Sequence, residues 1–259
     1  MTYEQQDFKI PVEADDYREC SDFVIKQIQS IMKKALAEGR NKILIHTNLK
    51  LGLPMENINK VAGPFIEAWA FEIFHDAFED KDNIYSLINV EAQERLNMAD
   101  VVLQFKKKRK HQTSITAAVD VKATAEDFEK SGRSPNITSF ARIRSAYVED
   151  PDYLFVILSL KHRVYSTRNG GTGMMEGVME VVDHHAYDLK FVSSSDISYN
   201  PALGTGQLQV RDIHYVTIEH RTTWEFCQML DRKFLNSSRR SLKAWKALAI
   251  QNGWIKNDD

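Results

Sequence analysis

The spacing of hydrophobic and polar positions predicts several helices along the chain. Residues 21–38 repeat apolar side chains at helical intervals, with Ser21 or Asp22 able to cap the start and Gly39 following the end. Residues 64–78 show a second and more apolar helical pattern. Further helices are expected over residues 137–148, 224–235 and 239–253.

Alternating and continuous apolar runs predict strands between these helices. Residues 84–93, 99–106 and 114–123 look like consecutive strands, and residues 152–162 form a continuous apolar run that is typical of a buried strand. A short strand is expected over residues 42–47, and short strand-like runs with loops over residues 163–223. The pattern predicts a single mixed α/β domain over residues 1–259, with a central, mostly antiparallel sheet flanked by helices.

One predicted strand contains charged residues that its apolar pattern does not explain. The run AAVDVKAT, residues 117–124, holds Asp120 and Lys122 among small apolar side chains. Side chains two residues apart on a strand point to the same face, so the carboxylate and the ammonium are expected side by side. Most acid-x-lysine pairs on strands are solvated residues on an exposed face, and a single pair of this kind is ordinarily interpreted in that way.

The preceding strand adds a second carboxylate to the same place. If residues 99–105 and 114–122 form a hairpin with its tip near Lys110, residues whose numbers sum to 220 face each other, which sets Asp100 opposite Asp120. Like charges in directly opposed positions destabilise a sheet. A third acid, Glu67, lies in the most apolar predicted helix, where an unpaired buried carboxylate costs several kcal/mol.

A divalent cation would neutralise these acids. Hard cations such as Mg²⁺ prefer carboxylate oxygens, and no Cys and His set suited to zinc is present. A metal held by Asp100 and Asp120 favours phosphoryl transfer to water, because it polarises a phosphate oxygen and activates a bound water. Lys122 would orient that water and stabilise the developing negative charge, and the residues leave open whether it also acts as a base.

Composition narrows the class of protein. The net charge of −2 means that any nucleic-acid binding needs a local basic surface. The amino terminus is too acidic and polar for a signal peptide, and no apolar run approaches the length of a membrane span. Cys20 and Cys227 form no disulfide framework. We therefore expect a cytoplasmic protein with reduced thiols.

The arrangement of acids and lysine resembles the signature of the PD-(D/E)xK nucleases. That signature is an acid at the start of one strand and acid-x-lysine on the next, represented here by Asp100 and by Asp120-x-Lys122. The sequence Met-Ala precedes Asp100, so the proline of the signature is missing, but that proline varies within the superfamily. The signature alone identifies no subfamily.

Surrounding segments sharpen the resemblance. The runs GPFIEAW, MADVVLQF, VDVKAT, SPNITSFARIR and SYNPALGTGQLQVRDI are similar, in the same order, to type II restriction endonucleases of the HincII and HpaI kind. The resemblance extends over most of the chain and implies a restriction-endonuclease-like core. It implies that Asp100, Asp120 and Lys122 are catalytic, that Asp100 and Asp120 bind Mg²⁺, and that Glu67 is the helix acid assisting the metal site.

The same resemblance implies the substrate and the assembly. Each subunit of a homodimer would cut one strand of double-stranded DNA within a short palindrome, since two-fold protein symmetry matches palindromic DNA. The site would have the form GTYRAC, and GTTAAC in particular, cut to blunt ends as part of a restriction-modification system. No organic cofactor and no membrane partner are expected.

Two loop segments would then contact DNA. Segment 133–136 resembles one that enters the grooves, and segment 198–207 resembles one that reads base edges in the major groove. Asn and Gln suit that role because they bond adenine bidentately. Without the resemblance, these are ordinary turn residues. The candidate DNA-binding residues are Arg133, Ser134, Asn136, Asn200, Ala202, Gln207 and Gln209.

Other interpretations of the residues stay open. The basic tracts 106–111 and 237–246 are more often solvated faces, although on a nuclease they could contact phosphates. A structure-selective or repair nuclease would share the metal site without base-reading loops. A non-catalytic DNA-binding protein would have lost the acids and lysine, and an unrelated metabolic α/β enzyme would show no salt-dependent DNA affinity.

Overall fold

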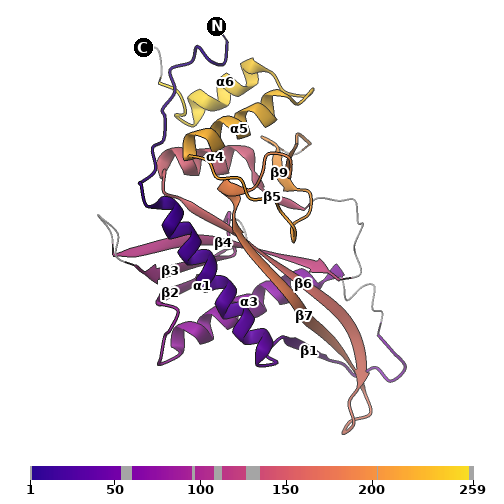
Figure 1. Ribbon diagram of the computed structural model, residues 1–259. Helices are drawn as coiled ribbons and strands as arrows, with labels where there is room; N and C mark the ends of the chain where they lie inside the picture. The colour runs from indigo at the N-terminus through magenta and orange to yellow at the C-terminus, as the bar shows by residue number, and fades with distance from the viewer. Residues whose placement is uncertain are drawn as a thin grey trace. The chain divides into compact units, whose positions relative to one another are not determined.

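In the computed structural model, the chain forms two compact units (Figure 1). The sheet unit comprises Asp22–Gly132 and Val156–Tyr187, and the terminal unit comprises Met1–Ser21, Arg133–Phe155 and Asp188–Asp259. The prediction of one domain over the whole chain stays a prediction. The structure describes residues 2–53, 60–94, 97–107, 113–126, 135–202 and 204–256.

A curled, mostly antiparallel sheet of six strands forms the centre of the sheet unit and confirms the predicted α/β class (Figure 1). The strands, in spatial order, are β1 (Lys42–His46), β7 (Met175–Asp188), β6 (Leu154–Arg168), β4 (Ser114–Ala125), β3 (Val101–Lys106) and β2 (Leu87–Ala92).

The hairpin of β3 and β4 has the register that the sequence predicted. Val101 pairs with Val119 and Lys106 pairs with Ser114, so partner numbers sum to 220 along the whole ladder. Burial alternates along β3, where Val101, Leu103 and Phe105 are buried, because successive side chains of a strand point to opposite faces. The apolar pattern therefore fixes which residues of β4 lie opposite which residues of β3.

Helix α3 (Ala62–Glu79) packs against β2 and β4. Its apolar stripe includes Ile66, Trp69 and Phe74, all buried, and this burial holds the helix on the sheet. Pro64 lies in the first turn, as predicted, where a missing backbone N–H costs little. The helix thus brings the side chains of its sheet-facing turns close to β4.

Helix α1 (Tyr17–Ala37) begins earlier than its apolar spacing suggested. The prediction that Ser21 or Asp22 caps its start is wrong, because both lie inside the helix. The Ser21 hydroxyl instead donates to a carboxylate of the terminal unit, Asp188 Oδ2, at 2.9 Å. Gly39 follows the end as expected, with a φ of 71° that a glycine adopts without strain.

The terminal unit combines a small sheet with three helices. Its three-stranded sheet has the order β5 (Asn136–Ser139), β9 (Gln207–Val210) and β8 (Ile197–Asn200). The helices are α4 (Phe140–Glu149), α5 (Thr223–Leu235) and α6 (Leu242–Gln251), and a short 3₁₀ turn, η1 (Leu189–Phe191), follows β7.

Two predictions for this part of the chain need correction. Residues 137–139 were expected to open a helix but belong to β5, which pairs with β9 at Asn136 and Ser139 and in which Ile137 and Thr138 are buried. Both residues are β-branched, which suits a strand. The short runs expected over residues 163–223 are in part long strands, since β6 continues to Arg168 and β7 runs from Met175 to Asp188.

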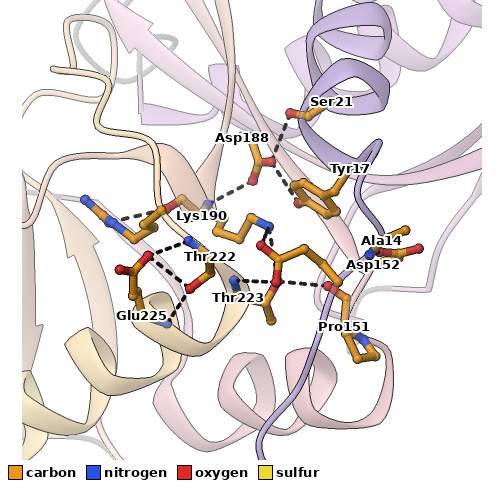
Figure 2. A network of polar contacts seen from close by, with 12 residues as sticks. Ala14, Tyr17, Ser21, Pro151, Asp152, Asp188, Lys190, Thr222, Thr223 and Glu225 are labelled. Carbon is orange, nitrogen blue, oxygen red and sulfur yellow. Dashed lines mark hydrogen bonds and ion pairs between the residues drawn. The ribbon is translucent and has the colours of Figure 1, made fainter.

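A buried polar network holds the start of α1 within the terminal unit (Figure 2). The Asp188 carboxylate accepts hydrogen bonds from the Tyr17 hydroxyl at 2.8 Å, the Ser21 hydroxyl and the Lys190 backbone N–H at 2.9 Å. The Lys190 ammonium lies 3.6 Å from Glu13 and donates to the Thr223 hydroxyl at 3.1 Å. Buried charges of this kind need such partners, so the network fixes the amino-terminal segment.

Two further observations bear on the expected class of protein. Within the described ranges, no helix is both long and apolar enough to cross a membrane. Cys20 and Cys227 are both buried, and they are not joined in a disulfide. Burial raises the pKa of Cys227 to about 12, so its thiol is the dominant form at neutral pH.

Candidate active site and base-reading face

Asp120 and Lys122 form an ion pair on β4. Asp120 is buried, with 3% of its surface exposed, whereas Lys122 is partly exposed. The Lys122 ammonium donates to Asp120 Oδ1 at 2.6 Å. Their position two residues apart places them on one face of β4, while Val119 and Val121 are buried on the other. The expected pairing of acid and base is therefore present.

Asp100, the residue directly before β3, lies beside this pair. The β3–β4 ladder ends at the pair Val101 and Val119, one position short of Asp100 and Asp120. Asp100 is nevertheless tied to β4 twice, since its backbone N–H donates to Val119 O at 3.0 Å and its Oδ2 accepts from the Val121 N–H at 2.7 Å. These two bonds join Asp100 to Val119 and Val121, the residues on either side of Asp120. The acid that the sequence selected thus lies beside Asp120.

Glu67 belongs to the same cluster from helix α3. Its side chain is half-buried, and burial raises its pKa above the ordinary range. The negative charge of Asp100 adds to that increase, and the positive charge of Lys122 opposes it. Both groups are therefore within electrostatic reach of Glu67, which matches the sequence-based expectation that the α3 acid faces the site.

Asp120 is the most deeply buried acid of the cluster. Burial raises its pKa to about 7, Lys122 opposes this increase, and the charges of Asp100 and Glu67 add to it. Its second oxygen, Oδ2, is buried and has no hydrogen-bond partner within the described part of the chain. A buried carboxylate oxygen without a partner is costly, so a cation at this oxygen would stabilise the site.

The donors present suit magnesium. Within the residues that the structure describes, no group of three or more His, Cys, Asp or Glu side chains is arranged around a common metal position. Mg²⁺ does not require such a cage, because it keeps several waters and binds through one or two carboxylates together with substrate phosphates. Asp120 Oδ2 and the carboxylate of Asp100 are the oxygens that fit this donor set.

The candidate base-reading residues gather on the small sheet of the terminal unit. Strand β9 lies between β5 and β8, and its Leu208 and Val210 are buried. Gln207 and Gln209 are only partly buried and alternate with these two residues. They therefore point to the opposite face of the sheet. This face, formed by the polar residues of β5, β8 and β9, is called the polar face.

The register brings four predicted residues together on the polar face. Asn200 pairs with Gln207 across β8 and β9, and Asn136 pairs with Gln209 across β5 and β9. The Gln209 amide also donates to Asn136 Oδ1 at 2.9 Å. Ser198 was missed, although it pairs with Gln209 and lies two residues before Asn200 on the same strand. Alternation along β8 would have indicated it.

The structure gives less support to a DNA-binding role for the other predicted residues. Asn200 Oδ1 accepts the Ala202 N–H at 3.0 Å, which is a local turn bond, so the ordinary turn interpretation also holds for this pair. Ala202 is exposed after β8. Arg133 and Ser134 lie outside the described residues, and their role in DNA binding stays a prediction.

Comparison with known proteins identifies the class. A family model described as type II restriction endonuclease HpaI matches residues 4–253. The curated protein "Type II restriction enzyme HpaI" of Haemophilus parainfluenzae is 54% identical over 257 residues, covering 99% of this chain and 100% of that protein. The enzyme is thus a type II restriction endonuclease, a site-specific deoxyribonuclease. The chain belongs to the HpaI family of these enzymes.

Family membership decides among the alternatives that the residues left open. It favours a restriction endonuclease with a DNA substrate over a repair nuclease, a non-catalytic DNA-binding protein or a metabolic enzyme. A solved structure described as NlaIV restriction endonuclease aligns with a TM-score of 0.47 and 16% identity, covering 87% of each chain. That likeness is too low to support either the fold or the function.

Proposed function

We propose that this restriction endonuclease is a Mg²⁺-dependent member of the PD-(D/E)xK superfamily. The observation that carries the proposal is the buried Asp120 Oδ2, which has no partner in the described residues and lies in a cluster with Asp100, Glu67 and Lys122. When bound, Mg²⁺ supplies Lewis-acid polarisation of a phosphate oxygen and lowers the pKa of a coordinated water.

Each side chain of the cluster would have its own role in cleavage. Asp120 and Asp100 hold the cation, and the Asp100 bond to the Val121 N–H keeps its carboxylate in place. Glu67 assists from α3. The Lys122 ammonium, partly exposed beside Asp120, would orient the attacking water and stabilise the negative charge that develops on the phosphate.

We further propose that a cytoplasmic homodimer of single-domain subunits cuts both strands of a palindrome. The target we propose has the form GTYRAC, and GTTAAC in particular, with blunt ends, within a restriction-modification system that protects the host. Asn200 and Gln207 support base reading because they pair across β8 and β9 and their amides can bond adenine bidentately. We also propose DNA contacts for Asn136, Gln209, Ala202, Arg133 and Ser134. A dimer matches the two-fold symmetry of a palindrome.

The test is digestion of bacteriophage DNA of known sequence with purified protein, in Mg²⁺ and in EDTA, followed by sequencing of all fragment ends. We expect discrete blunt fragments at GTTAAC or GTYRAC in Mg²⁺ alone. Ends scattered over the sequence would contradict the restriction assignment, and staggered ends or another hexamer would correct the target. An Asp120→Asn protein that cuts as fast as wild type would overturn the proposed active site.

A further inference from the structure

Arg240 anchors the connection between β8 and β9. The tract 237–246 was expected to be a solvated face or a phosphate contact, yet the Arg240 guanidinium binds within the protein. Its Nε donates to the Tyr199 hydroxyl at 2.8 Å, and its Nη2 donates to the carbonyls of Pro201 at 3.0 Å and Gly204 at 2.7 Å. Three bonds from one planar group thus join the two ends of this connection.

Two aromatic rings, Phe234 of α5 and Tyr199 of β8, lie next to the guanidinium itself. Arg240 lies 5.3 Å from the ring centroid of Phe234 and 6.0 Å from that of Tyr199. Phe234 is fully buried and stacks on Phe140 at 4.9 Å. The arginine is therefore fixed against the packed core of α4 and α5, which makes it a rigid support rather than a mobile surface side chain.

The connection is also closed around Tyr199. The Tyr199 hydroxyl donates to Thr205 O at 2.7 Å while it accepts the bond from Arg240. Gly206 has a φ of 92°, and a Cβ there would lie 2.2 Å from the Tyr199 ring, so only glycine allows this close approach. The Thr205 hydroxyl lies 2.9 Å from that of Ser139 on β5. These contacts fix the backbone on both sides of the connection.

We propose that Arg240 is a positioning residue for sequence discrimination, an inference that rests on the proposed reading of DNA by the polar face. Asn200 lies between Tyr199 and Pro201, and Gln207 follows Gly206 directly. Both candidate base-reading side chains therefore flank backbone that Arg240 holds. Arg240 acts through the loop geometry, and its charge is already engaged by protein oxygens rather than offered to phosphates.

The physical reason is geometric. A bidentate contact from Asn or Gln to a base discriminates by about 10-fold to 100-fold, but only while the amide and the base edge are aligned. If the connection between β8 and β9 moves, the difference in affinity between cognate and non-cognate bases becomes smaller. Loss of Arg240 should therefore change the ratio between cognate and near-cognate cleavage, and not only the overall rate.

Two substitutions separate anchoring from charge. Arg240→Lys keeps the positive charge but has no planar fork to reach three acceptors, and Arg240→Gln removes the charge as well. Arg232→Gln, at an exposed position of α5, makes the same charge change elsewhere in the same unit. Tyr199→Phe keeps the ring and removes only the hydroxyl, so it tests the anchor even if the Arg240 variants fold poorly.

The experiment is digestion of bacteriophage DNA in Mg²⁺ with sequencing of every fragment end, and melting temperatures are measured in parallel. For both Arg240 variants, we expect cleavage at sites differing by one base pair to rise about 10-fold relative to the main site. Tyr199→Phe should change the ratio in the same direction by a smaller factor, and Arg232→Gln should leave it at the wild-type value.

Specific outcomes overturn the inference. If Arg240→Lys keeps the wild-type ratio while Arg240→Gln slows all sites equally with a shallower salt dependence, Arg240 is a phosphate contact. Unchanged ratios in Tyr199→Phe and both Arg240 variants also overturn it. A wild-type protein that produces no discrete fragments instead contradicts the proposed function on which the inference rests.

Discussion

The carboxylate of Asp100 accepts a hydrogen bond at 2.7 Å from the backbone N–H of Val121, the residue between Asp120 and Lys122. This bond links Asp100, the residue directly before β3, to the acid-x-lysine segment of β4. It uses one oxygen of Asp100 and leaves the charge of the carboxylate in place beside Asp120. The cluster is therefore held by backbone as well as by side-chain contacts.

The Asp100 bond separates a structural from a chemical role for this residue. Asparagine keeps an oxygen that can accept the Val121 N–H but lacks the charge, whereas alanine lacks both. We expect Asp100→Asn and Asp100→Ala to cut DNA about 10²-fold to 10³-fold more slowly than wild type. Only Asp100→Ala should also lose stability, by about 1 kcal/mol, because a backbone donor is left unpaired.

Single-turnover cleavage rates and urea unfolding of the two Asp100 variants check this prediction. Equal stability of Asn and Ala variants would mean that the bond to Val121 contributes nothing. An Asn variant with wild-type cleavage would remove Asp100 from the active site.

Lys122 should be required for cleavage but not for binding. Lys122→Met preserves the length of the side chain and removes the ammonium that lies 2.6 Å from Asp120 Oδ1. We expect cleavage to fall about 10²-fold or more, since the charge on the phosphate loses its partner, while DNA binding measured in Ca²⁺ stays near wild type.

Lys33→Met, on the exposed face of α1, is the matched control for loss of one lysine charge. It should retain wild-type cleavage. A Lys122→Met protein that loses binding and cleavage in equal proportion would show that Lys122 serves mainly to attract DNA.

The sequence predicts the structure around the acid cluster better than it predicts the structure around the polar face. The β3–β4 hairpin was predictable because its apolar alternation and a short connection determine which residues face each other. Residues 137–139 were misassigned because their strand depends on pairing with β9, about 70 residues later in the chain. Arg240 could not be found from local pattern, since its partner Tyr199 lies 41 residues away.

The pH dependence of stability should report the buried carboxyl of Asp120. Its pKa is raised from near 4 to about 7 by burial, so the folded protein prefers the protonated form. The contribution of this carboxyl to stability is therefore fully present below pH 4 and is lost as the pH rises through 7. In EDTA, Asp120→Asn should become progressively more stable relative to wild type, by up to about 1.4 kcal/mol per pH unit across that range.

Thermal unfolding in EDTA at pH 5, 6, 7 and 8 measures this difference. Glu79→Gln, at an exposed position of α3, removes a carboxyl from the same unit and is measured alongside as the matched control. A constant difference between Asp120→Asn and wild type would mean that Asp120 is ionised throughout.

Gly206 should tolerate alanine poorly compared with another glycine of positive φ. Both Gly206 and Gly253 have a positive φ, at 92° and 64°, so alanine is strained at either position. Nothing lies within 4 Å of a Cβ at Gly253, whereas at Gly206 the Tyr199 ring lies 2.2 Å away. Gly253→Ala should cost about 1 kcal/mol, and Gly206→Ala clearly more, because the ring must move. Equal melting temperatures for the two variants would contradict the close packing of Tyr199 on Gly206.

The buried pair of Arg144 and Asp231 should be the most sensitive polar contact of the terminal unit. Both side chains are fully buried, and Arg144 Nη2 lies 3.2 Å from Asp231 Oδ2. Asp231 also accepts from the Tyr3 hydroxyl at 2.8 Å and from the Trp245 indole N–H at 2.9 Å. Removing the acid leaves the guanidinium buried without its counter-charge, so Asp231→Ala should lose about 3–5 kcal/mol.

Urea unfolding of Asp231→Ala, compared with Asp7→Ala, measures this effect against that of an exposed acid. Asp7 pairs with Lys256 at 3.3 Å, but both side chains are more than half exposed, with 60% and 69% of their surfaces in solvent. Exposed ion pairs contribute little, so Asp7→Ala should leave the unfolding midpoint almost unchanged. If Asp231→Ala unfolds at the wild-type midpoint, the Arg144 guanidinium is reached by water in solution, and the buried pair does not hold the amino-terminal segment to α5 and α6.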